Sequence, residues 1–110
     1  MPIKADWIDF KVESIRILPT DLIGVYECGR KRGNKVLYIG KGVIRARLLD
    51  HVEKKKFLDV VTHFRKRKTH PDDALKAEDK LLEEYKKKYG KYPLLNKIKS
   101  SGDPWKGILY

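Results

Sequence analysis

Long apolar runs are absent from this sequence of 110 residues, and cysteine is almost absent. The longest apolar stretches span only a few residues, whereas a transmembrane helix needs roughly 20, so we expect no membrane span or membrane partner. Cys28 is the one cysteine, which excludes an internal disulfide, and no His and Cys cluster has zinc-ligand spacing. The first ten residues lack a basic segment followed by an apolar one, so we expect no secretory leader and a cytoplasmic protein.

Acidic residues are also scarce, because 15 Asp and Glu face 26 Lys and Arg, which gives a net charge of +11. Residues 1–27 carry a net charge of −2 and residues 28–110 carry +13. Such a basic region attracts polyanions, of which nucleic acid is the commonest in a cell. A solvated lysine-rich surface is the alternative interpretation. The residues that we expect to contact nucleic acid are Lys54, Lys55, Lys56, Arg65, Lys66, Arg67 and Lys68.

The spacing of apolar residues predicts one domain that contains both strands and helices. Strands are expected at residues 22–28, 35–39 and 58–68, and helices at 43–53 and about 69–90. A turn with Gly and Asn joins the first two strands into a hairpin, and Gly40 and Gly42 are expected to end the second strand. Thr69 and Asp72 resemble a capping box at the start of the second helix, and Gly90 is expected to end it. Residues 6–18 suit either an edge strand or a short helix.

Glu78 falls on the apolar stripe of the second helix. At about 100° per residue, with Ala74 at zero, Glu78 lies at about 40°, between Tyr85 at about 20° and Leu82 at about 80°. An unpaired buried carboxylate costs several kcal/mol, so Glu78 requires a partner. One interpretation is an internal ion pair with a Lys or Arg, and the other is a metal ligand or an acid–base group.

Two further pairs of residues indicate chemistry. Arg47 and His51 are four residues apart on the first helix and share one face, which suits an anion bound between them. Tyr26 and Tyr38 lie in the two hairpin strands, and both rings stand on one face if the register pairs them. The alternatives are a solvated basic helix face and a simple cross-strand packing pair. Gly24 and Gly40 leave room beside the tyrosines for a backbone or a ligand.

These features together resemble the signature of the GIY-YIG nuclease family. Gly24-Val25-Tyr26 is followed, after eleven residues, by Tyr38-Ile39-Gly40. The later blocks of the signature are Lys41-Gly42, Arg47 with His51 on the following helix, Glu78 in a later helix, and a PLLN segment that ends at Asn96. The resemblance covers about residues 22–97, and its strength lies in the order and spacing of the blocks rather than in any one of them.

The resemblance implies an α/β (α+β) fold with a small three-stranded antiparallel sheet flanked by helices. Residues 22–110 would form this nuclease-like domain, and residues 1–21 an N-terminal extension that packs on the core. The implied activity is that of a metal-dependent DNA endonuclease, a phosphodiester hydrolase that uses one Mg²⁺ or Mn²⁺ ion. Tyr26 and Tyr38 would be the active-site tyrosines, Arg47 the phosphate-stabilising arginine and Glu78 the metal-binding carboxylate.

Three more residues correspond to family positions. Asn96 would order the site, while Lys41 and His51 match residues that some or many members carry.

The interval between Gly40 and Arg47 is about one residue shorter than in the family, so Arg45 competes with Arg47 for the arginine role. We prefer Arg47 because only Arg47 has His51 one helical turn further on. Tyr38 or His51 would help to deprotonate the attacking water, with Tyr26 holding the water or the phosphate, and the choice of base stays open.

The substrate is less defined than the reaction. Sequence-specific members of the family usually carry an extra recognition domain, for which 110 residues leave no room. We therefore expect structure-directed or weakly sequence-specific cleavage of DNA, as in repair or recombination, or a partner protein that supplies target recognition. The alternative is a catalytically inactive, basic module of the same fold that binds DNA or RNA.

Overall fold

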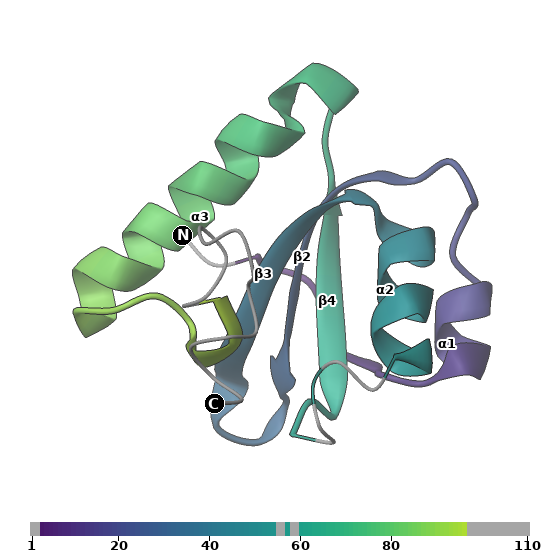
Figure 1. Cartoon of the computed structure of the whole chain (residues 1–110), viewed down its shortest axis with the longest axis horizontal. Helices are drawn as coiled ribbons and strands as arrows, with labels where there is room; N and C mark the ends of the chain where they lie inside the picture. Colours follow the sequence, from purple (N-terminus) through teal and green to yellow (C-terminus); the bar gives the residue numbers. More distant parts are fainter. Residues whose placement is uncertain (1–2, 55–56, 58–59, 97–110) are drawn as a thin grey trace.

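An antiparallel sheet lies between two helical layers in the computed structural model, which describes residues 3–54, 57 and 60–96 (Figure 1). The sheet order is β1-β4-β2-β3, and the strands are β1 (Ile8–Asp9), β2 (Ile23–Arg30), β3 (Lys35–Val43) and β4 (His63–Lys68). One face is covered by α3 (Ala74–Tyr89), and the other by α1 (Val12–Arg16) and α2 (Ile44–Glu53). We call these the α3 face and the α2 face.

The sheet has four strands where the sequence predicts three. The extra strand β1 is only two residues long and pairs with β4 through Ile8 and Phe64. The segment 6–18 thus supplies both a short edge strand and a short helix. Ile3, Ile15 and Leu18 are buried, so the described part of residues 1–21 contributes three side chains to the core. Residues 97–110, which include the end of the expected domain, lie outside the described residues.

The β2–β3 hairpin forms as expected, but its second strand is longer. Gly33 and Asn34 in the turn have φ values of 78° and 50°, a left-handed conformation that Gly and Asn adopt most easily. The expectation that Gly40 and Gly42 end the strand is wrong. Both glycines remain paired with β2, opposite Tyr26 and Gly24, and β3 runs on to Val43.

The helix that carries Glu78 begins later than the sequence predicts. A short 3₁₀ turn, Pro71–Asp73, precedes α3, and the His70 ring accepts a hydrogen bond from the backbone N–H of Asp72 at 3.2 Å. The expected cap at Thr69 is therefore wrong: His70 caps the 3₁₀ turn, and Asp73, the N-cap residue of α3, makes no side-chain capping bond. At the other end, Gly90 adopts φ 78° and ends the helix as predicted.

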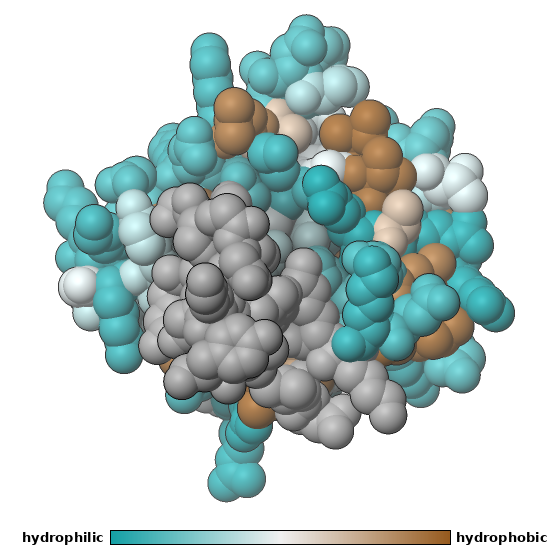
Figure 2. Space-filling model, viewed as in Figure 1, coloured by the Kyte–Doolittle hydropathy of each residue, from teal (hydrophilic) through white to brown (hydrophobic). Residues whose placement is uncertain are grey.

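Alternation along the strands divides the core into two clusters. Tyr26 and Cys28 face α1 and α2, whereas Val25 and Ile39 pack with Leu81 on α3. None of the helices in the described ranges has the length and apolar character that crossing a bilayer would require. Hydrophilic side chains cover most of the described surface visible in Figure 2, and apolar ones form small separate patches.

Candidate active site

Tyr26 and Tyr38 both lie on the α2 face, but they are not directly paired. The register places Tyr26 opposite Gly40 and Tyr38 opposite Cys28, so the register that would pair them does not form, although both rings share this face. The two ring centroids are 6.2 Å apart. A Cβ atom on Gly40 would collide with the Tyr26 ring. Gly40 therefore makes room for Tyr26 itself, not for a ligand.

His51 joins the two tyrosines from α2. Its Nε2 atom and the Tyr26 hydroxyl share a hydrogen bond of 2.9 Å, and its ring meets the Tyr38 ring edge-on at 5.3 Å. Phe57 packs against His51 at 4.6 Å and against Tyr38 at 5.0 Å. Sequence reasoning missed Phe57, although a lone aromatic residue directly after three lysines was the available signal.

Arg47 lies one turn before His51 and is exposed. Its Nε atom is 3.0 Å from the position that a Cβ of Gly42 would occupy, so the side chain runs over the end of β3. Its positive charge lowers the pKa of both tyrosines, an effect smaller than that of burial. Arg45 is half-buried, and its Nε has no hydrogen-bond partner among the described residues. The geometry therefore favours Arg47 over Arg45 as the arginine that acts on the tyrosines.

Glu78 is buried on α3, with only 3% of its surface exposed, as the helical arithmetic predicts. It lies on the same stripe as Ala74 and Leu81, which are also buried. Its negative charge helps to raise the pKa of Tyr26 and of Tyr38. Glu78 from α3 and Arg47 from α2 thus act with opposite sign on the same two phenols.

The phenols keep their protons more tightly than free tyrosine does. Burial, as the main cause, raises the pKa of Tyr38 to about 12 and the pKa of Tyr26 well above its usual 10.0. Arg47 offsets only part of this effect. A tyrosine acting as base would need cations that lower its pKa, and the side chains of this site do not supply enough positive charge. Both phenols are hydrogen-bond donors at neutral pH.

Asn96 holds the strand that carries Tyr38. Its side-chain oxygen accepts from the backbone N–H of Ile39 at 2.7 Å, and its amide donates to the carbonyl of Ile39 at 2.9 Å. This pair of hydrogen bonds to the residue after Tyr38 fits the ordering role that the resemblance implies.

Lys41 does not lie beside the tyrosines. It follows Ile39 by two residues, so strand alternation directs its side chain to the α3 face.

The basic residues of β4 divide between the two faces. Lys66 and Lys68 are opposite Tyr26 and Gly24, which places their side chains on the α2 face beside the tyrosines. Arg67 is exposed and belongs to the α3 face, and Lys54 is exposed at the end of α2. Arg65 is only 5% exposed, so it does not belong to the basic surface. Lys55 and Lys56 lie outside the described residues.

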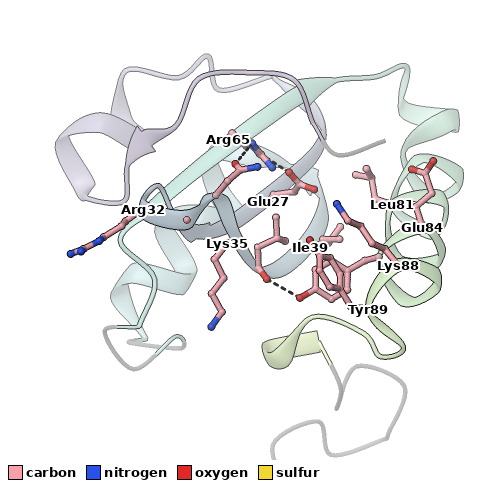
Figure 3. A pocket seen from close by; sticks show the side chains of 13 residues that line it. Glu27, Arg32, Lys35, Ile39, Arg65, Leu81, Glu84, Lys88 and Tyr89 are labelled. Atoms are coloured by element: carbon pink, nitrogen blue, oxygen red, sulfur yellow. Dashed lines mark hydrogen bonds and ion pairs between the residues drawn. The ribbon is translucent and has the colours of Figure 1, made fainter.

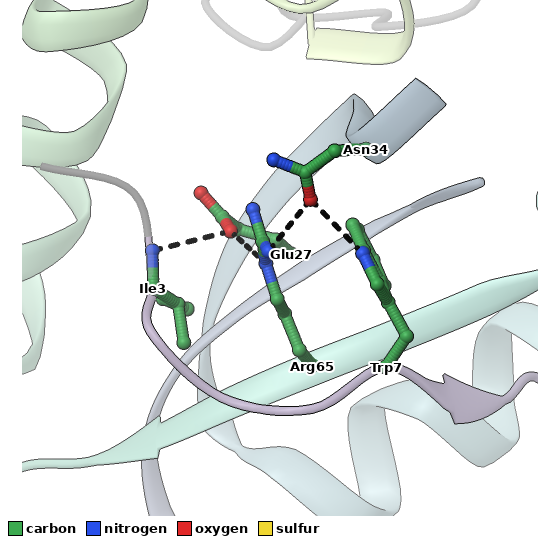
Figure 4. Close-up of polar contacts among 5 residues, drawn as sticks. All are labelled: Ile3, Trp7, Glu27, Asn34 and Arg65. Carbon is green, nitrogen blue, oxygen red and sulfur yellow. Dashed lines mark hydrogen bonds and ion pairs between the residues drawn. The ribbon is translucent and has the colours of Figure 1, made fainter. Parts of the chain in front are cut away.

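Arg65 instead forms a buried network on the α3 face, which sequence reasoning missed (Figure 4). Its Nε donates to Glu27 at 2.7 Å and its Nη1 to Asn34 at 2.9 Å. Glu27 also accepts from the backbone of Ile3 at 3.3 Å, and the Arg65 guanidinium stacks 4.2 Å above the Trp7 ring. Burial raises the pKa of Glu27, and Arg65 offsets this only in part. The available signal was a carboxylate in an otherwise apolar strand.

Few side chains of this site could ligate a metal ion. Among the described residues, no three His, Cys, Asp or Glu side chains lie together so that they could hold an ion by themselves. Mg²⁺ commonly binds one or two carboxylates and completes its shell with water and substrate phosphate. Glu78 is the carboxylate that acts on the tyrosine cluster, and it would serve as this single ligand.

Comparison with known proteins places the chain in a family without assigning it an activity. No curated protein and no solved structure matches the chain. A family model, described as a domain of unknown function (DUF7508), matches residues 1–88. The matched range includes Tyr26, Tyr38, Arg47, His51 and Glu78, and it ends before Asn96. Because the match spans most of the sequence, this chain belongs to the DUF7508 family.

Proposed function

We propose that this chain is a metal-dependent DNA endonuclease of the GIY-YIG type. The observation that supports this proposal is the cluster of Tyr26, Tyr38 and His51. The charges of Arg47 and Glu78 act on the two phenols of this cluster. These residues come from β2, β3, α2 and α3, and they are far apart in the sequence. They are the residue types that phosphodiester hydrolysis requires.

Arg47 is the proposed phosphate-binding residue. Hydrolysis of a phosphodiester builds negative charge on the phosphate oxygens, and an enzyme stabilises this charge with cations that are already in place. A guanidinium presents two parallel N–H donors to a phosphate. Arg47 is exposed beside the tyrosines, where a DNA strand can reach it.

We assign the proton-accepting role to His51 acting through Tyr26. Since the pKa of Tyr26 is raised, its phenol stays protonated, and in this assignment it would be the donor of the hydrogen bond that it shares with His51 Nε2. The attacking water would pass a proton to the Tyr26 oxygen while Tyr26 passes its own proton to His51. Tyr38, whose pKa is about 12, would donate a hydrogen bond to a phosphate oxygen. This assignment selects His51 rather than Tyr38 as the base.

Glu78 would hold the divalent ion. A bound Mg²⁺ or Mn²⁺ would act as a Lewis acid and stabilise the charge of the leaving 3′-oxygen. Glu78 contributes the negative charge that attracts the ion, and its burial within α3 fixes its position.

DNA would reach the cluster along the side of the α2 face that Lys66 and Lys68 border. Both lysines are opposite residues of the GVY segment in β2, so their charge flanks the tyrosines. Contacts of lysine with phosphate fix the position of the duplex without reading its sequence. Such contacts agree with structure-directed or weakly specific cleavage in repair or recombination, with target choice left to DNA shape or to a partner protein.

A catalytically inactive nucleic-acid-binding module of the same fold is the second candidate. The observation in its favour is the burial of Tyr26, of which only 1% is exposed and whose hydroxyl is bonded to His51. In this candidate the cluster would be a packed polar core. The cluster would then hold α2 against the sheet, and the lysines alone would bind DNA or RNA.

Cleavage assays separate the two candidates. The purified chain is incubated with nicked, branched, single-stranded and plain duplex DNA, in the presence of Mg²⁺, Mn²⁺ or a chelator. The endonuclease proposal predicts products from at least one substrate with a divalent ion and none with the chelator. Binding to all four substrates without products under any condition would support the inactive module.

A further inference from the structure

A cavity of about 580 Å³ lies between the sheet and α3, on the face opposite the tyrosine cluster (Figure 3). Its volume is within the range of small-molecule sites, about 300–1,000 Å³. Val36 and Ile39 on β3 and Leu81 on α3 contribute apolar surface. Arg65 and Glu27 line it where β2 and β4 run together. The proposed nuclease mechanism uses none of these residues.

Arg65, one of the residues that line the cavity, has an unused hydrogen-bond donor. The residue is 5% exposed, and its Nε and Nη1 are bonded to Glu27 and Asn34. Its Nη2 is buried and has no hydrogen-bond partner among the described residues. An unsatisfied buried donor costs about 1–3 kcal/mol, so an acceptor that enters here gains an available partner. Because Glu27 already balances the charge of Arg65, a neutral acceptor such as a base carbonyl is sufficient.

The α3 side of the cavity presents aromatic rings and positive charge. Tyr85 and Tyr89 have ring centroids 4.5 Å apart, and the Lys88 ammonium lies 5.3 Å above the Tyr89 ring. Planar bases stack well on such rings. The charged lining residues are Arg32, Lys35, Arg65 and Lys88, with Glu27 and Glu84. This set carries two more positive than negative charges and favours an anion.

We propose that this cavity binds a nucleoside monophosphate. The base would lie against the tyrosine rings with an acceptor toward Arg65, and the phosphate would lie near Lys88 at the rim. The apolar walls and tyrosine rings suit the base, the Arg65 donor suits an acceptor on that base, and the Lys88 ammonium suits the phosphate. A free nucleotide and the terminal nucleotide of a DNA strand present the same chemistry. The proposal is independent of the proposed cleavage, because none of the residues that line the cavity takes part in the proposed mechanism.

Calorimetric titration tests the ligand class. The whole chain is titrated with the 5′-monophosphates of adenosine, guanosine, cytidine and uridine, with the four nucleosides, and with inorganic phosphate, all without divalent metal. We expect at least one nucleotide to bind about tenfold tighter than its nucleoside and than phosphate, since the ring and phosphate contacts add. The absence of nucleotide binding, or equal binding of phosphate alone, would overturn the proposal.

A charge-matched pair of variants locates the binding. Lys88→Glu reverses a charge at the cavity rim, and Lys87→Glu makes the same change at an exposed neighbour that does not line the cavity. Lys88→Glu should weaken nucleotide binding about tenfold, while Lys87→Glu should stay near wild type. An equal loss of nucleotide affinity in both variants would mean that the overall charge of the protein causes the effect, and it would contradict binding in this cavity. The side-chain Nε–H resonance of Arg65 should shift on nucleotide addition and stay unchanged with phosphate.

Two further measurements identify the source of the nucleotide and separate this site from catalysis. Competition by a 5′-phosphorylated single-stranded oligonucleotide, but not by its unphosphorylated form, would identify a DNA end as the source. Absence of competition by both would identify the free nucleotide. Glu78→Gln should bind the nucleotide as wild type does. Failed DNA cleavage would therefore leave this proposal standing, and failed nucleotide binding would leave the nuclease proposal standing.

Discussion

Each face of the sheet buries a polar cluster, and the two clusters differ in how their groups are balanced. On the α3 face, the carboxylate of Glu27 meets the guanidinium of Arg65 at 2.7 Å, and backbone and side-chain groups complete the network. On the α2 face, two phenols with raised pKa values surround His51, and Arg47 remains exposed beside them. In the first cluster the charges of Glu27 and Arg65 offset each other, whereas the second brings two phenols together beside the exposed cation of Arg47.

The difference teaches that burial of a carboxylate does not by itself reveal its role. Glu27 and Glu78 are 2% and 3% exposed. Glu27 lies in an ion pair that joins β2 to β4, and we interpret it as structural. Glu78 acts electrostatically on both tyrosines, and we interpret it as the metal ligand. The following predictions test whether the Glu27–Arg65 pair serves stability while the tyrosine cluster, with Arg47 and Glu78, serves chemistry.

The largest effect on stability is expected at the ion pair of the α3 face. Glu27→Gln leaves the Arg65 charge buried without its counter-charge, so the free energy of unfolding should fall by about 3–5 kcal/mol. Urea denaturation measures this change. Glu78→Gln is the matched variant, because it makes the same substitution at an equally buried carboxylate. If Glu78 serves a metal ion, the free energy of unfolding should fall by less in Glu78→Gln than in Glu27→Gln. Equal destabilisation of both variants would mean that Glu78 is also half of an ion pair.

The arginine of the α2 face should affect catalysis rather than stability. Arg47→Ala should lower the rate of DNA cleavage about 10²-fold, since it removes a cation that stabilises charge in the transition state. Arg45→Ala, two residues away on the same helix, should change the rate little. Single-turnover cleavage with saturating enzyme provides the measurement. If Arg45→Ala has the larger effect, our placement of the catalytic arginine is wrong.

Basic residues of β4 that lie on the two faces of the sheet should differ in their contribution to DNA binding. Lys66→Glu and Lys68→Glu alter the tyrosine side of β4, and each should weaken DNA affinity about tenfold and reduce the dependence of affinity on salt. Arg67→Glu is the control, because its side chain belongs to the α3 face of the same strand. Fluorescence anisotropy at several salt concentrations measures both quantities. Three equal losses would indicate that the basic strand binds without a preferred face.

The smallest effect is a pH dependence of stability from Tyr38. Its pKa is about 12 in the folded chain and about 10 in the unfolded chain. Above about pH 10 the unfolded chain releases a proton that the folded chain retains, so stability falls as the pH rises. Between about pH 9 and 11, wild type should lose about 1 kcal/mol more than Tyr38→Phe. Denaturation curves of equal pH dependence would contradict the burial of this phenol.

Local patterns in the sequence predicted the features that depend on one element. The 100° arithmetic placed Glu78 on the buried stripe of α3, and Gly90 marked the end of the helix. In each case the physical cause lies within a few residues of the feature, so a single sequence contains the necessary information.

Features that depend on distant partners were not predictable in this way. Arg65 looked like one more surface base in the segment HFRKRK, because its partner Glu27 is 38 residues away. The register of Tyr26 with Gly40 depends on the turn and on the β-bulge between Cys28 and Gly29, which no local pattern specifies. The strand β1 is two residues long and forms only because β4 presents a free edge. These errors are errors of pairing, not of local structure.

The most direct test of the central claim measures binding and cleavage in the same sample. Wild type and Glu78→Gln are compared on the DNA substrate that wild type cuts best, or on branched DNA if it cuts none, with Mg²⁺ present, by scoring bound and cleaved DNA together. We predict that both proteins bind the DNA equally and that only wild type produces cleaved strands. Equal binding without cleaved DNA in either protein, or equal cleavage by both, would contradict the assignment of the tyrosine cluster and Glu78 as a nuclease site.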